Sequence, residues 1–85
     1  MPMVSMTDLR EMMRRFVSGD DRGQALAGEI EVALEDLMGE REPFASVALA
    51  LASYRPEGGP FLYGEAEMVP MIAQALRALD DGEEK

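Results

Sequence analysis

Residues 20–38 read DDRGQALAGEIEVALEDLM and form the longest stretch of the chain with one uninterrupted hydrophobic period. Leu26, Ile30, Ala33, Leu34 and Leu37 recur at the spacing that puts side chains on one face of a helix. The opposite side carries acidic residues and no lysine. The stretch therefore predicts a helix over residues 20–38 with a core face and an acidic back, and we expect the rest of the chain to be arranged around it.

The composition predicts one folded domain over residues 1–85. A chain of 85 residues falls within the size range of a single domain, and its apolar fraction of 47% is normal for a globular protein. The net charge of -9 repels nucleic-acid phosphates and anionic membranes. We therefore expect no nucleic-acid or membrane partner, and basic protein surfaces become the natural partners.

The residue types that are absent narrow the function further. The chain has no Cys and no His, which removes Cys/His zinc sites, disulfides, thiol nucleophiles and the commonest general base. We expect neither an enzyme nor a cofactor. The first residues lack the pattern of a signal peptide, and no segment has the roughly 20 apolar residues of a membrane span. These features predict a cytoplasmic protein.

Three further helices are predicted, over residues 7–18, 43–54 and 65–80, with an acidic tail over residues 80–85. Ser5 or Thr7 can cap the first helix, and Pro43 suits the first position of the third. The third helix carries one apolar stripe at Phe44, Val47, Leu51 and Tyr54, and a second at Ala45, Ala48, Leu49 and Ala52. Because it is apolar nearly all round, we expect it to be central.

The linker over residues 55–64 and the proline after it leave one question open. Phe61, Leu62 and Tyr63 are apolar and are expected to cover one end of the bundle. Pro70 is unfavourable deep inside a helix, so the last helix either begins near Glu67 or begins at Glu65 and kinks. Four helices with short connections predict an all-α, antiparallel four-helix bundle.

The acidic back of the second helix is the first candidate binding site. On a helical wheel Val32 falls opposite the core, and an apolar residue ringed by carboxylates resembles a small interface centre with a charged rim. Gly28 lies one turn earlier and would let another backbone approach. The simpler interpretation is a solvated face that keeps a small protein soluble. Glu29, Glu35 and Asp36 surround Val32, and Glu31 completes the acidic face.

The second candidate site follows the linker. Tyr63 is a candidate aromatic anchor, and Glu65 and Glu67 form a second acidic cluster. Acids near a helix start are also expected from the helix dipole, so an end cap with capping acids is an equal alternative. An acyl-carrier protein is excluded, because neither Ser18 nor Ser46 stands in the Asp-Ser-Leu sequence that carries the prosthetic arm.

Several of these features together resemble the colicin D immunity family and related small bacterial immunity proteins. The first predicted helix ends at residues 16–19, the second ends near Leu37, and Pro43 starts the third. Pro56 and the Phe-Leu-Tyr-Gly-Glu segment at residues 61–65 then lead into a final helix that contains Leu76 and Leu79. The resemblance covers most of the chain and rests on apolar spacing and a few turn residues. It implies a four-helix antiparallel bundle that binds the C-terminal nuclease domain of a toxin and blocks its tRNA-cleaving site.

The expected function is therefore that of a non-enzymatic immunity protein. It would bind a basic toxin nuclease domain, with a tRNA-cleaving ribonuclease as the first expectation, through carboxylates that take the places of nucleic-acid phosphates. The alternative is a structural or regulatory helical module that forms a homodimer through an apolar bundle face.

Overall fold

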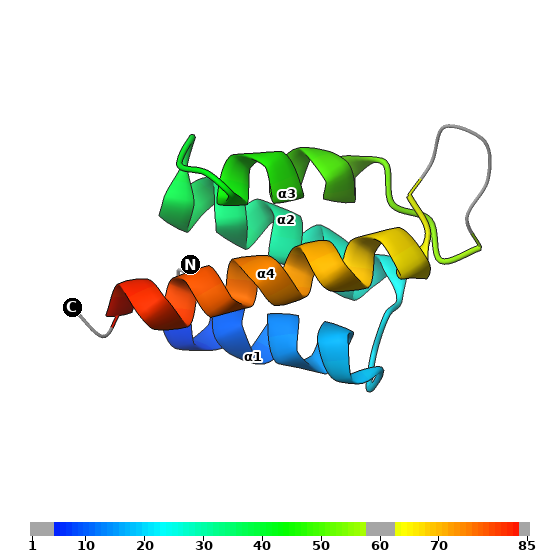
Figure 1. Ribbon diagram of the computed structural model, residues 1–85. Helices are drawn as coiled ribbons and strands as arrows, with labels where there is room; N and C mark the ends of the chain where they lie inside the picture. Colours follow the sequence, from blue (N-terminus) through cyan, green and yellow to red (C-terminus); the bar gives the residue numbers. More distant parts are fainter. Residues whose placement is uncertain (1–4, 58–62, 84–85) are drawn as a thin grey trace.

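Four helices form an antiparallel bundle in which each helix packs against the next and the last packs against the first (Figure 1). The structure is a computed structural model that describes residues 5–57 and 63–83. The helices are α1 (Met6–Ser18), α2 (Gln24–Met38), α3 (Phe44–Ala52) and α4 (Glu65–Glu83). The predicted all-α four-helix bundle is confirmed. The radius of gyration, 12.0 Å, matches the value of about 12 Å expected for a compact chain of this length.

The first helix begins and ends at local signals in the sequence. Ser5 Oγ accepts a hydrogen bond from the Asp8 N–H (3.1 Å), and the Asp8 carboxylate accepts one from the Ser5 N–H (3.3 Å). This reciprocal capping box satisfies two N–H groups that a helix start leaves without partners. Gly19 ends the helix at φ +89°, a conformation that side chains with a Cβ rarely adopt. Of the two predicted caps, Ser5 and Thr7, Ser5 is therefore the one that caps the helix.

The second helix is shorter than predicted, because it begins at Gln24 and not at Asp20. Gly23 is extended (φ -70°, ψ 162°), and Asp21 Oδ1 accepts a hydrogen bond from its N–H at 2.9 Å. The Asp21 N–H itself donates to the Arg15 carbonyl of α1 (3.2 Å). These contacts hold the connection against the end of α1, so α2 begins only after Gly23.

The third helix lies at a corner of the bundle, so the prediction that it is central is wrong. It packs against α2 and α4, and the first predicted stripe, Phe44, Val47, Leu51 and Tyr54, is buried there. Of the second stripe only Ala48 is buried, while Leu49 is 75% exposed and Ala52 is also at the surface. Two neighbours cannot cover both stripes of one helix.

The fourth helix begins at Glu65 and runs to Glu83, with Pro70 inside it. Of the two predicted starts, Glu65 is therefore confirmed and Glu67 is wrong. The predicted tail from residue 80 is also wrong, since the helix continues to Glu83. Asp80 Oδ1 lies 3.1 Å from Arg10 Nε of α1, an ion pair that holds this last part of the helix against the bundle.

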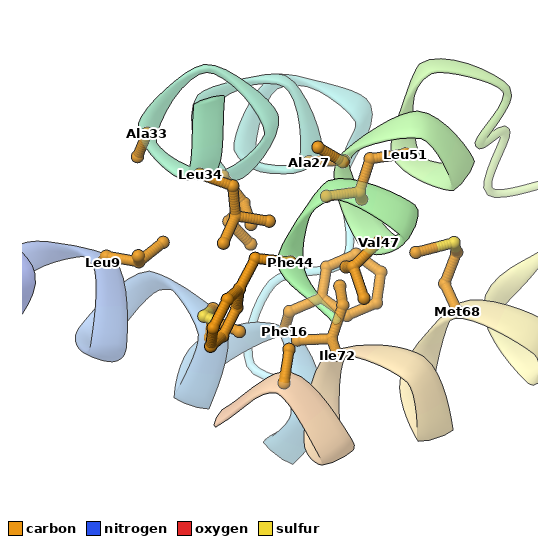
Figure 2. Close-up of a cluster of buried hydrophobic side chains, with 14 of the residues drawn as sticks. Leu9, Phe16, Ala27, Ala33, Leu34, Phe44, Val47, Leu51, Met68 and Ile72 are labelled. Atoms are coloured by element: carbon orange, nitrogen blue, oxygen red, sulfur yellow. The ribbon is translucent and has the colours of Figure 1, made fainter. Parts of the chain in front are cut away.

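The core lies between the four helices, where residues from every element meet (Figure 2). The core face predicted for the second helix is confirmed at Leu26, Ile30, Ala33 and Leu34, while Leu37 is half-buried. The rings of Phe16 and Tyr54 pack edge to face with their centres 5.3 Å apart. The largest fully buried side chains are Tyr54, Phe16, Leu9, Met13, Ile30, Leu34, Met68 and Ile72.

Candidate partner-binding surface

The acidic face of α2 consists of Glu29, Glu31, Glu35 and Asp36 around Val32. Val32 is 56% exposed, as the helical wheel predicts, and the carboxylates are exposed except Glu31, which is half-buried. Among residues 5–57 and 63–83, none of the four acids makes an ion pair or a side-chain hydrogen bond. The structure thus brings these five residues together on one surface with their charges unmatched.

The unmatched charge arises because the arginines lie on other elements. Arg10 and Arg14 of α1 reach Asp80 (3.1 and 4.0 Å), and Arg15 reaches Asp20 and Asp21 (3.4 and 3.5 Å). The α2 helix itself contains no basic residue. These paired arginines therefore lie on α1, and the only charged side chains on α2 are acidic.

An apolar surface on α3 adjoins the acidic face. A shallow hollow of about 430 Å³ between α2 and α3 is lined by Glu35, Gly39, Glu40, Ala45, Ala48 and Leu49. Glu35 of the acidic face and the exposed Leu49 therefore border the same depression. Sequence reasoning missed Leu49, although one signal was present: residues 43–54 contain no charged side chain, which is unusual for a chain with 29% charged residues.

Gly28 lies one turn before Val32 on the acidic face of α2 and has free space around it. A Cβ built on Gly28 would meet nothing within 4 Å, so no neighbouring side chain or backbone among the described residues requires a glycine there. The helix accepts the lower propensity of glycine without a packing reason in the described fold. This observation is compatible with the approach of another backbone, as the sequence suggests.

The second candidate cluster is engaged within the fold. Glu65 Oε1 lies 3.3 Å from Arg22 Nη1, and Glu67 Oε1 accepts a hydrogen bond from the Gly64 N–H at the start of α4 (2.8 Å). Tyr63 is 38% exposed, and its backbone pairs with Ser53 and Arg55. These contacts favour the end-cap interpretation for Glu65 and Glu67. Phe61 and Leu62, expected to cover the same end, lie outside the described residues.

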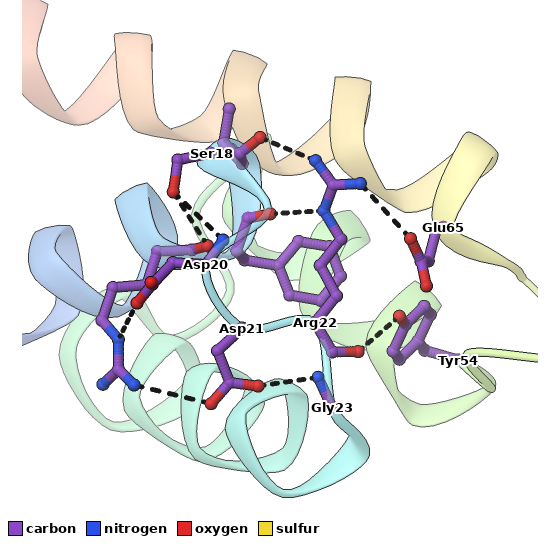
Figure 3. A network of polar contacts seen from close by, with 10 residues as sticks. Ser18, Asp20, Asp21, Arg22, Gly23, Tyr54 and Glu65 are labelled. Atoms are coloured by element: carbon purple, nitrogen blue, oxygen red, sulfur yellow. Dashed lines mark hydrogen bonds and ion pairs between the residues drawn. The ribbon is translucent and has the colours of Figure 1, made fainter.

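Arg22 is the centre of a polar network that sequence reasoning did not identify (Figure 3). Its Nε and Nη2 donate to the carbonyls of Phe16 and Val17 in the last turn of α1, at 2.8 and 2.9 Å. A cation at this place is favourable because helix carbonyls lack partners there and the dipole is negative. The Arg22 carbonyl in turn accepts a hydrogen bond from the Tyr54 hydroxyl (2.7 Å).

The pKa of Tyr54 in this network is raised above its ordinary value. Burial raises the pKa of Tyr54, the Glu65 carboxylate raises it further, and the Arg22 guanidinium acts in the opposite direction. Its hydroxyl is already used as a donor to a backbone carbonyl. The network therefore connects the ends of α1, α3 and α4, and its groups serve the fold.

Charged side chains lie at or near the surface in the part of the chain whose burial is described, residues 5–57 and 63–81. Within the described residues no three acidic side chains gather as they would around a metal ion. None of the helices in the described ranges is long and apolar enough to cross a membrane.

Comparisons with protein-family profiles, curated proteins and solved structures find no match to this chain.

Proposed function

We propose that this protein is a stoichiometric, non-enzymatic inhibitor that binds a basic protein through the acidic face of α2. The observation that supports the proposal is the set of four carboxylates around Val32, which have no ion-pair partner among the described residues. The resemblance to colicin D immunity proteins makes a tRNA-cleaving toxin nuclease the partner class to test first.

A nuclease fits this surface because its cleft must hold phosphates and is therefore lined with Lys and Arg. Glu31 and Glu35 lie one turn apart on a single helix and repel each other by a few tenths of a kcal/mol. A basic partner removes that repulsion and gains opposite charges held on a rigid element. Val32 supplies an apolar centre inside the charged rim.

The test is a charge reversal with a matched control. The probe is the basic nuclease domain encoded beside the gene for this chain, and the dissociation constant is measured by calorimetry over a series of salt concentrations. Glu31→Lys combined with Glu35→Lys is expected to weaken binding at least about 100-fold, and wild-type binding is expected to weaken steeply as salt rises.

The control is Glu57→Lys combined with Asp81→Lys, two exposed acids in the loop after α3 and on α4. Each replacement adds two charges, so both double variants change the net charge from -9 to -5. The control is expected to bind within a few-fold of wild type. Equal losses in both variants, no loss in either, or a gene with no toxin beside it would contradict the proposal and favour a solvated face.

A further inference from the structure

The exposed side of α3 belongs to a helix that carries no charged residue. No charged residue occurs from Pro43 to Tyr54, whereas 17 acids and 8 bases are spread over the rest of the chain. Leu49 is 75% exposed, more than either of the other large apolar side chains at the surface, Val32 and Tyr63. Such a side chain on an uncharged helix face is a feature of protein interfaces when it has a complementary surface to enter.

Leu49 stands between two shallow hollows. The hollow toward α2 is lined by small residues, Gly39, Ala45 and Ala48, and also by the acids Glu35 and Glu40. The other, about 390 Å³, lies toward α4 and is lined by Ser46, Leu49, Ala50, Ala52, Ser53, Tyr63 and Met71. The surface therefore combines one protruding leucine with adjacent depressions that can receive a side chain. A surface of that kind can be complementary to itself about a twofold axis.

The charges at the two ends of α3 indicate which arrangement would form. Arg41 and Glu42 precede the helix, and Arg55 and Glu57 follow it. Arg41 lies eight residues before Leu49, and Glu57 lies eight residues after it. An antiparallel crossing at Leu49 therefore brings Arg41 toward Glu57 of the other copy, and Glu42 toward its Arg55. A parallel crossing would bring like charges together.

We propose that a second copy of this chain covers α3, with the two helices antiparallel and each Leu49 seated in the uncharged hollow between α3 and α4 of the other copy. Two molecules of charge -9 repel each other, and the hollow between α3 and α4, whose lining residues are uncharged, is a place where they can meet without opposing carboxylates. One face of a nine-residue helix is a small interface, so the dimer is expected to be weak, with a dissociation constant in the micromolar range. This inference is independent of the acidic face of α2.

The first experiment measures the mass of the full chain by sedimentation equilibrium. From about 10 µM to about 1 mM, the mass should rise from 9.3 kDa toward twice that value. The rise should be greater in high salt, because screening reduces the repulsion between two acidic copies. Binding to a basic partner has the opposite salt dependence, which distinguishes the two kinds of association.

Two exposed apolar side chains provide a matched pair of variants. Leu49→Asp should remain at 9.3 kDa over the whole concentration range, because it puts two carboxylates into the proposed contact. Ala66→Asp introduces the same carboxylate at an exposed position on α4 and should dimerise like the wild type. A wild-type mass that stays at 9.3 kDa, or equal behaviour of the two variants, overturns the proposal and leaves α3 to a different partner.

The orientation is tested by exchanging charges. Arg41→Glu should weaken the dimer several-fold, because it replaces the attraction to Glu57 of the other copy with repulsion between two carboxylates. Arg41→Glu combined with Glu57→Arg should restore the wild-type dissociation constant, since the pair is then reversed and attractive again. If the second change gives no recovery, the antiparallel arrangement is overturned.

Discussion

At the scale of single residues, Arg22 and Tyr54 hold three helix ends together. Arg22 donates to two carbonyls at the end of α1 and lies 3.3 Å from Glu65 at the start of α4. Tyr54, just after α3, donates to the Arg22 carbonyl and packs its ring against Phe16. The bundle end where α1, α3 and α4 meet is thus fixed by polar contacts as well as by apolar packing.

The raised pKa of Tyr54 predicts how stability depends on alkaline pH. A group whose pKa is higher in the folded than in the unfolded state contributes stability that is fully present below its unfolded pKa, about 10. That stability is lost as the pH rises from there through the folded-state value. Urea unfolding of the wild type should therefore give a free energy that is constant to about pH 10 and falls above it.

Tyr54→Phe is the control for that measurement. At pH 8 it should be less stable by about 1–2 kcal/mol, because the Arg22 carbonyl loses its 2.7 Å hydrogen bond. Above pH 10 it should lose less stability than the wild type, since the ionising group is gone. If both proteins lose stability in parallel, Tyr54 is not the group responsible.

At the scale of elements, hydrophobic periodicity predicted the four helices and the inward face of α2. The period of α2 placed Ile30 and Leu34 in the core and Val32 outside, as observed, because the spacing of side chains on one helix is a local property. The bounds of α2 were not predictable in the same way. Asp20 and Asp21 are typical of helix starts, but here contacts with Arg15 of α1 determine their conformation.

The unpredicted part of the candidate surface depends on contacts between elements. A helix that is apolar on both sides gives no indication of which stripe faces solvent, so the exposure of Leu49 follows only from α3 having two neighbours. The contact between Arg22 and Glu65 joins residues 43 positions apart, and no local pattern indicates it. The acidic face could be placed from the sequence, whereas its apolar neighbour could not.

Pro70 lies inside α4 and removes one backbone hydrogen bond from the helix. It lies in the second turn, where its missing N–H leaves the Ala66 carbonyl without its usual helical partner. Both residues are exposed, so water can hydrate that carbonyl. Pro70→Ala restores the hydrogen bond and should raise the free energy of unfolding by about 1–2 kcal/mol, after allowance for the greater freedom of the unfolded chain.

Gln74→Ala, one turn later at another exposed position, is the control and should change stability by no more than about 0.5 kcal/mol. Chemical denaturation of both variants measures the difference. A loss of stability in Pro70→Ala would mean that the fixed backbone of proline matters more at this position than the hydrogen bond it removes.

At the scale of the whole molecule, charge is segregated between faces. The ion pairs among the described residues involve α1, α4 and the α1–α2 connection, while α2 carries unmatched acids and α3 carries no charge. Segregation separates two modes of association. The proposed binding of a basic partner to the acidic face would weaken as salt rises, whereas the proposed dimer through α3 would become stronger.

The same distribution predicts that salt stabilises the folded chain. The ion pairs join mostly half-exposed side chains and contribute about 0–1 kcal/mol each, so screening them costs little. The excess of nine negative charges repels itself more strongly when folded than when unfolded. Raising NaCl from about 10 mM to about 500 mM should therefore raise the melting temperature by several degrees.

The melting experiment needs conditions that keep the chain monomeric, because dimerisation would also raise the melting temperature with salt. Circular dichroism at a low protein concentration meets that need. Glu31→Gln combined with Glu35→Gln should melt at a higher temperature than wild type in low salt and respond less to added salt, since both changes remove repulsion on α2. A melting temperature that falls with salt would mean that the ion pairs around Arg10, Arg15 and Arg22 contribute more to stability than the acidic excess costs.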